Sequence, residues 1–156
     1  PSSQRPARIV QRFPRVIRRR LESLSEYLAI LERVAAYTEK EFLADPERYG
    51  SAERFLQLAL ESVLDIANHI IADEGLGTVH QSRDIPKVFR QRGLIDGDLE
   101  HRWLRMIGFR NILVHAYLEL DRSAVYRFLT QDREDFRRLQ RVFAQFLDDG
   151  PNGSPE

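Results

Sequence analysis

The chain has 156 residues, of which 42% are hydrophobic and 31% charged, and this composition favours one folded, soluble domain over a disordered segment. It contains no cysteine, which excludes disulfides, thiolate metal ligands and a cysteine nucleophile and fits a cytoplasmic protein. No apolar run approaches the roughly 20 residues that cross a bilayer, so we expect no contact with a membrane.

The formal net charge is zero, but the charges are unevenly distributed. Residues 1–20 contain seven arginines and no acidic residue. We interpret residues 1–13 as a flexible arm, because they hold two prolines and many polar groups. Such an arm is suited to guiding a polyanion, and it is equally consistent with a solvated tail or a segment that docks on a partner.

A first helix is expected to begin at Pro14, since proline is tolerated in the first turn. Apolar residues recur at steps of three and four over residues 21–35, which is the pattern of an amphipathic helix. The helix should run to about Leu43. Asp45-Pro46 then ends it, because the residue before a proline is pushed out of helical geometry.

The second helix should open at Gly50-Ser51, with Ser51 as N-cap, and end in the segment 73–77. Its apolar residues cover nearly the whole circumference, which indicates burial on more than one side. Asp65, Asn68 and His69 interrupt this surface. Because buried polar groups need partners, these three are secondary site candidates, although caps or hydrogen bonds between helices would equally account for them.

Three further helical stretches follow. A short helix should occupy residues 84–92, a longer one should start at residues 96–98 and extend through the segment 110–117, and the last should begin at Asp121 with a break near residues 130–132. No alternation typical of strands is present.

The predicted fold is therefore all-α, an up-and-down four-helix bundle with one additional short helix. We expect residues 14–149 to form its single domain and residues 150–156, which are rich in glycine and proline, to form a flexible tail.

The sequence offers little for metal or cofactor chemistry. Di-iron bundles need a glutamate three residues before a histidine, and none of the four histidines has one. No serine occupies a glycine-flanked elbow, and no glycine-rich phosphate loop is present. We expect neither a metal nor a cofactor.

The stretch Gly108–Tyr117 stands out because polar groups alternate tightly with an apolar run. Residues 112–114, Ile-Leu-Val, should lie in the core and hold the backbone rigid, so that neighbouring polar side chains are presented from a stiff support. Histidine carries protons near neutral pH, and arginine binds phosphate oxygens. Arg110 and His115 therefore suit metal-independent cleavage of RNA by its own 2′-hydroxyl.

Helix geometry places the side chains of this pair on different faces of the helix. Arg110 and His115 are five residues apart, so they diverge by ~140° and are separated by a rise of ~7.5 Å. Asn111 lies one turn before His115 and is able to orient either neighbour. Two copies facing each other across a two-fold axis would place both pairs around one groove, and we infer a homodimer with a composite site.

The stretch Arg110-Asn111-Ile112-Leu113-Val114-His115-Ala116-Tyr117 resembles the R-x-x-x-x-H-x-Y signature of HepT-type toxins in the HEPN superfamily. The likeness extends to Tyr49-Gly50, to the helix containing Asp65–Ile71 and to Asp121–Leu129, and it covers about residues 16–148.

This resemblance implies a HEPN-like dimeric bundle that acts as a metal-independent endoribonuclease, the toxin of a type VII-like HEPN/MNT pair. It also implies a minimal nucleotidyltransferase (MNT) antitoxin that transfers AMP from ATP onto the tyrosine of the motif, here Tyr117. In this interpretation Arg110 stabilises charge on the scissile phosphate, His115 is the general acid or base, and Asn111 orients one of them.

Two alternatives stay open. The chain is also consistent with a non-catalytic HEPN subunit that binds a nucleotidyltransferase partner or a nucleotide. A purely structural bundle, in which His115 only fills the core, predicts that this histidine is inaccessible to solvent.

Overall fold

The computed structural model describes residues 14–115 and 117–147, so the predicted arm at 1–13 and tail at 150–156 lie outside the described residues. Within the described ranges every secondary-structure element is helical. The elements are α1 (Pro14–Ala35), α2 (Glu39–Leu43), α3 (Pro46–Glu74), α4 (Asp84–Gln91), α5 (Gly97–His115), the 3₁₀ turn η1 (Tyr117–Glu119), α6 (Arg122–Gln131) and α7 (Arg133–Ala144).

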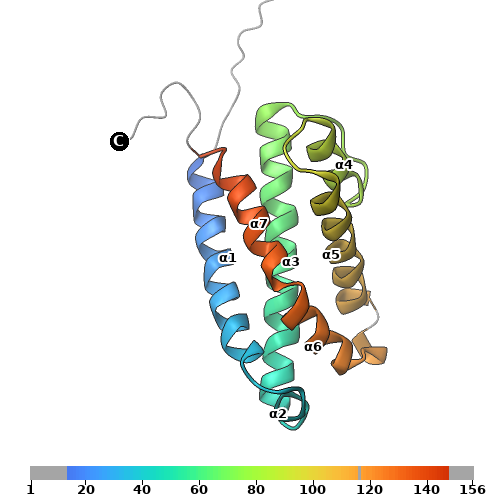
Figure 1. Cartoon of the computed structure of the whole chain (residues 1–156). Helices are drawn as coiled ribbons and strands as arrows, with labels where there is room; N and C mark the ends of the chain where they lie inside the picture. The colour runs from blue at the N-terminus through green and yellow to red at the C-terminus, as the bar shows by residue number, and fades with distance from the viewer. Residues whose placement is uncertain (1–13, 116, 148–156) are drawn as a thin grey trace, which may run out of the picture.

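Four rods run side by side in alternating directions (Figure 1): α1, α3, α5 and the broken rod made of α6 and α7. The short helices α2 and α4 lie at opposite ends of the bundle. The break between α6 and α7 falls at Asp132, as predicted. Asp121 caps α6 by accepting a hydrogen bond from the amide of Ser123 at 3.0 Å. The predicted all-α, up-and-down architecture is confirmed.

The predicted end of the first helix at Leu43 is wrong. α1 stops at Ala35, and a separate helix, α2, begins after Thr38. The Thr38 hydroxyl accepts from the Glu41 amide at 3.1 Å, and the Glu41 carboxylate accepts from the Thr38 amide at 2.9 Å. This reciprocal capping box stabilises a new helix start, and its signature, a threonine followed three residues later by a glutamate, is present in the sequence.

The predicted start of the second long helix at Ser51 is also wrong. α3 begins at Pro46, and Asp45 is its N-cap, with the side chain accepting from the Glu47 amide at 2.9 Å. An Asp-Pro pair that ends one helix is equally suited to begin another, because proline fits the first helical position. Gly50 and Ser51 therefore lie inside α3.

α3 is the central helix of the bundle. Ten of its side chains are buried: Ala52, Leu56, Ala59, Leu60, Val63, Leu64, Ile66, Ala67, Ile70 and Ile71. By length and composition alone α3 is able to cross a membrane, unlike the expectation from the sequence. Half of its most apolar window is nevertheless buried inside the protein, as in the core helix of a bundle.

Aromatic contacts fix α5, the helix that carries the motif, against its neighbours. The Trp103 ring lies edge-on to Phe89 of α4 and Phe143 of α7, with centroid separations of 5.2 and 5.9 Å. Next to Arg110, the ring of Phe109 stacks on Phe128 of α6 at 4.1 Å. These large buried surfaces hold the motif helix in a defined orientation.

A group of charged side chains joins α5 to the start of α7. Asp132 and Asp135 are both buried, and they contact Arg105 at 3.3 Å and Arg102 at 3.6 Å respectively. Burial raises the pKa of Asp135 above its usual value of 3.8, and the Arg102 guanidinium opposes this effect only in part. Asp135 therefore holds its proton to a higher pH in the folded protein than in the unfolded chain.

Replacing Asp135 by asparagine should change how stability depends on pH. The contribution of Asp135 to the free energy of unfolding is fully present below pH 3.8, the pKa of this carboxyl in the unfolded chain. It is lost as the pH rises through the higher pKa of the folded protein. As the pH rises from 3 to 7, the free energy of unfolding of Asp135→Asn, measured with urea, should therefore increase relative to that of the wild type.

Asp98 provides a contrast, because a hydrogen bond from Arg138 lowers its pKa. The contribution of Asp98 to the free energy of unfolding is present above pH 3.8, its pKa in the unfolded chain, and is lost at lower pH. As the pH rises over the same range, the free energy of unfolding of Asp98→Asn should therefore decrease relative to that of the wild type. Parallel curves for the two variants would contradict this account.

Candidate active site

The motif lies at the C-terminal end of α5. Arg110, Asn111 and His115 belong to the helix, which ends at His115. Tyr117 opens the turn η1, beyond the helix, and the side chain of Tyr117 is not among those described. The prediction that this helix extends through residue 117 is therefore wrong.

Only part of the apolar run in the motif is buried, so the prediction that all three residues lie in the core is wrong. Leu113 is buried, Val114 is half-buried, and the side chain of Ile112 is 47% exposed. Three consecutive residues span ~200° around a helix, so they do not all face the same core. Ile112 lies instead beside the exposed Asn111.

Arg110 is held from two sides. One terminal nitrogen, Nη1, donates to the Asn111 side-chain oxygen at 3.1 Å. The other, Nη2, lies 3.9 Å from a carboxylate oxygen of Glu61 on α3. The structure thus pairs Asn111 with Arg110, one of the two partners that the sequence left open. These two contacts restrict the guanidinium, while the Arg110 side chain as a whole is 27% exposed.

The Arg110 side chain also lies against apolar residues of α3 and α5. It borders a small apolar space with Leu60 and Val63 of α3 and with Met106 and Ile107 of α5. Its Nε is buried and has no hydrogen-bond partner. These apolar neighbours and the polar contacts of the two terminal nitrogens together limit the rotation of the guanidinium.

His115 is exposed at the last position of α5. This accessibility argues against a purely structural role in the core. It leaves the imidazole free to meet a ligand, as proton transfer requires.

The secondary candidates do not join this site. Asp65 forms an ion pair with Arg20 of α1, Asn68 is exposed, and His69 is half-buried. Within the described ranges, none of the three has a hydrogen bond or ion pair to Arg110, Asn111 or His115. The role of Asp65 is to tie α1 to α3, consistent with the alternative of contacts between helices.

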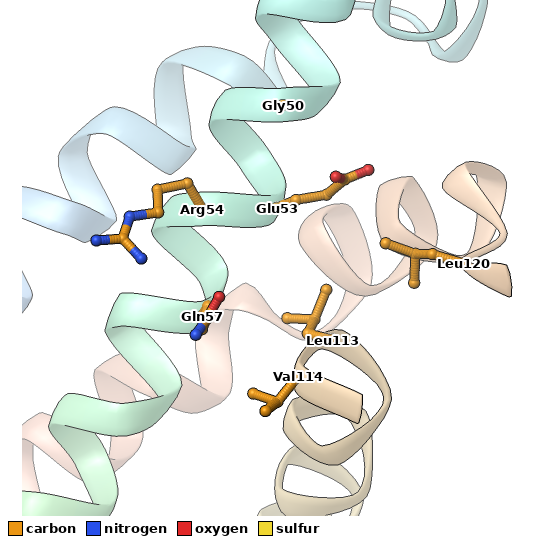
Figure 2. A pocket seen from close by; sticks show the side chains of 7 residues that line it. All are labelled: Gly50, Glu53, Arg54, Gln57, Leu113, Val114 and Leu120. Carbon is orange, nitrogen blue, oxygen red and sulfur yellow. The ribbon is translucent and has the colours of Figure 1, made fainter. Parts of the chain in front are cut away.

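A pocket of about 350 Å³ lies between α3 and the end of α5. In Figure 2, Leu113 and Val114 extend from the end of α5 towards Gln57 on α3. The remaining lining residues are Gly50, Glu53 and Arg54 of α3 and Leu120, which follows η1. The lining combines apolar side chains with charged and amide groups, and Leu113 and Val114 of the motif form part of its apolar wall.

The contact that sequence reasoning missed comes from α3. Gln57 donates from Nε2 to Glu61 at 3.3 Å, and the same carboxylate oxygen faces Arg110. A signal is present in the sequence, because Gln57, Glu61 and Asp65 recur every fourth residue in the most apolar part of the helix. Such spacing places polar groups along one side, but it does not say which helix they face.

No cluster of three or more histidine or acidic residues suited to a metal occurs among residues 14–115 and 117–147. The expectation that the protein needs no metal stays a prediction.

Comparison with known proteins identifies the family of this chain. Residues 24–142 match the family model described as ribonuclease HepT-like. The mRNA nuclease HepT of Shewanella oneidensis is 39% identical over 84 residues, which are 54% of this chain and 63% of that protein. The tRNA nuclease HepT of Aphanizomenon flos-aquae is 26% identical over 134 residues, 86% of this chain and 91% of that protein.

Solved structures are similar to this chain in fold. A tri-AMPylated HEPN toxin of Shewanella oneidensis, in complex with its MNT antitoxin, superposes with a TM-score of 0.75 and 29% identity over 83% of this chain and 96% of that one. The protein YutE of Bacillus subtilis has the same fold, with a TM-score of 0.78 at 17% identity over 90% of this chain and 94% of that one. The family match spans most of the sequence and confirms the resemblance seen in the motif: the chain belongs to the ribonuclease HepT-like family.

Proposed function

We propose that this protein is the endoribonuclease toxin of a HEPN/MNT toxin–antitoxin pair. Family membership and the relatives named as mRNA and tRNA nucleases support this class. The observation that carries the proposal for this chain is that the end of α5 presents both the partly exposed side chain of Arg110, which Asn111 and Glu61 contact, and the exposed imidazole of His115. We place the protein in the cytoplasm, where RNA and ATP are both present.

The reaction needs no group beyond the RNA and the side chains. The 2′-hydroxyl attacks the adjacent phosphorus, the bond from phosphorus to the 5′-oxygen breaks, and the products are a cyclic phosphate and a 5′-hydroxyl. Arg110 stabilises the negative charge that builds up on the phosphate oxygens. His115 transfers a proton, either from the attacking hydroxyl or to the leaving oxygen.

A homodimer completes the site. Arg110 contacts α3, whereas His115 is exposed some ~140° further round α5, so a single copy does not direct both groups at one phosphate. The exposed apolar side chains of Ile112 and Leu118, 47% and 86% accessible, flank the motif. A two-fold interface would bury them and would bring Arg110 of one copy to His115 of the other.

The antitoxin would act on Tyr117. The Tyr117 oxygen would attack the α-phosphorus of ATP, lose its proton, and displace pyrophosphate as the bond between the α- and β-phosphates breaks. The attached AMP adds a phosphate charge and a bulky nucleoside at the end of the motif, which opposes RNA binding by competing for Arg110. The tri-AMPylated toxin in the Shewanella oneidensis complex supports this mode of control.

Purified protein should cleave bulk tRNA in the presence of a metal chelator, and treatment with an MNT antitoxin and ATP should stop the cleavage. Tyr117→Phe should cleave at the wild-type rate and resist the antitoxin, because it has no hydroxyl to modify. Intact mass should show AMP increments that map to Tyr117 in the wild type. A wild-type protein that binds the antitoxin but cleaves no RNA would instead favour the non-catalytic HEPN subunit.

A further inference from the structure

We infer that Glu61 of α3 is a positioning residue for Arg110: its carboxylate fixes the guanidinium for the transition state and, by its charge, weakens the binding of RNA. The inference rests on the proposed nuclease function and adds a residue outside the motif to the site.

The contacts form a continuous chain from α3 to the motif. Gln57 donates to Glu61 Oε2 at 3.3 Å, and this oxygen lies 3.9 Å from Arg110 Nη2. Arg110 Nη1 then donates to Asn111 at 3.1 Å. Glu61 and Asn111 thus act on different terminal nitrogens, Asn111 through a hydrogen bond and Glu61 through a longer ion pair, and together they restrict the orientation of the guanidinium.

The surroundings leave Glu61 as the only carboxylate paired with Arg110 among the described residues. The apolar side chains of Leu60, Val63 and Met106 line the space beside Arg110, and Arg110 Nε is covered without a partner. Rotation of the guanidinium is therefore opposed by packing at its base and by Glu61 and Asn111 at its tip. Each terminal nitrogen keeps a second N–H that is available to a phosphate.

Stability alone does not account for this arrangement. The Glu61 side chain is 40% exposed, and ion pairs at such exposure contribute little to folding because water screens them. A carboxylate beside a phosphate-binding arginine also repels RNA. Glu61 therefore acts against substrate binding, and its benefit lies in the orientation of Arg110 when charge develops in the transition state.

These two effects predict a split in the kinetic constants. Glu61→Gln keeps the shape of the side chain and removes its charge. We expect kcat on bulk tRNA to fall by about tenfold, since a displaced catalytic group loses much of its effect. KM should fall by about three- to fivefold, because one negative charge near the phosphate is removed. The midpoint of thermal unfolding should stay at the wild-type value.

Glu32→Gln is a matched control. Glu32 of α1 pairs with Arg137 of α7 at the same distance, 3.9 Å, away from the motif helix. This variant should leave both constants unchanged. In an Arg110→Ala background, Glu61→Gln should have no further effect on kcat, because the group that it positions is absent.

Binding of a 2′-O-methylated RNA, which is not cleaved, separates this inference from the proposed function. Glu61→Gln should bind that RNA about three- to fivefold more tightly than the wild type does, whether or not the wild type cleaves RNA. An unchanged kcat, or a lower kcat with unchanged RNA affinity and a lower unfolding midpoint, would overturn the inference. Absence of cleavage by the wild type would instead overturn the proposed function.

Discussion

Replacing His115 by alanine is expected to lower kcat by about 10²–10⁴-fold, the usual contribution of a positioned proton carrier. The imidazole is exposed at the end of α5 and has no packing role in the core. The free energy of unfolding should therefore change little, and the loss should appear in single-turnover cleavage of bulk tRNA.

His101 supplies the matched control, because it is another exposed histidine on the same helix, more than two turns before the motif. His101→Ala should cleave at the wild-type rate. A His115→Ala protein that is folded and fully active would remove His115 from the mechanism, and equal losses in both variants would point to damage to α5 instead.

Replacing Arg110 by alanine is expected to lower kcat by about 10²–10³-fold, as for the loss of one preorganised group that stabilises transition-state charge. Arg110→Lys should recover little of this activity. A lysine ammonium lacks the planar fork that here donates to Asn111 and faces Glu61 at the same time. Single-turnover rates measured with saturating RNA isolate this effect from binding.

Arg141 is the control for arginine content, since it is exposed on α7 and paired with Glu134. Arg141→Ala should have the wild-type rate. Full activity of Arg110→Lys would show that charge alone is sufficient and that the orientation by Asn111 and Glu61 is irrelevant.

Most of the fold could be predicted from the sequence, because helical periodicity and capping residues are local signals. The structure confirms the predicted break at Asp132 and the predicted cap at Asp121. The wrong helix boundaries at Leu43 and Ser51 arose where one short segment carries signals both for the end of one helix and for the beginning of the next. To choose between these signals, one must know which helix packs onto the core, and the spacing of residues in the sequence does not contain this information.

The site was predictable only in part. The sequence motif predicted Arg110, Asn111 and His115 as site residues. The family match supports the predicted class of protein. Glu61 was missed because it is distant in sequence and reaches Arg110 only through the packing of α3 against α5. The burial of Ile112 was overestimated because the face of α5 that meets α3 is set by tertiary packing.

Mixing two inactive variants tests most directly whether Arg110 and His115 of different copies form one site. If Arg110→Ala and His115→Ala proteins are unfolded together, refolded and compared with each alone, random pairing leaves about a quarter of the composite sites with both side chains. The account predicts that the mixture recovers about this fraction of wild-type cleavage. A mixture no more active than its components, or a wild-type protein that is a monomer at the assay concentration, would contradict it.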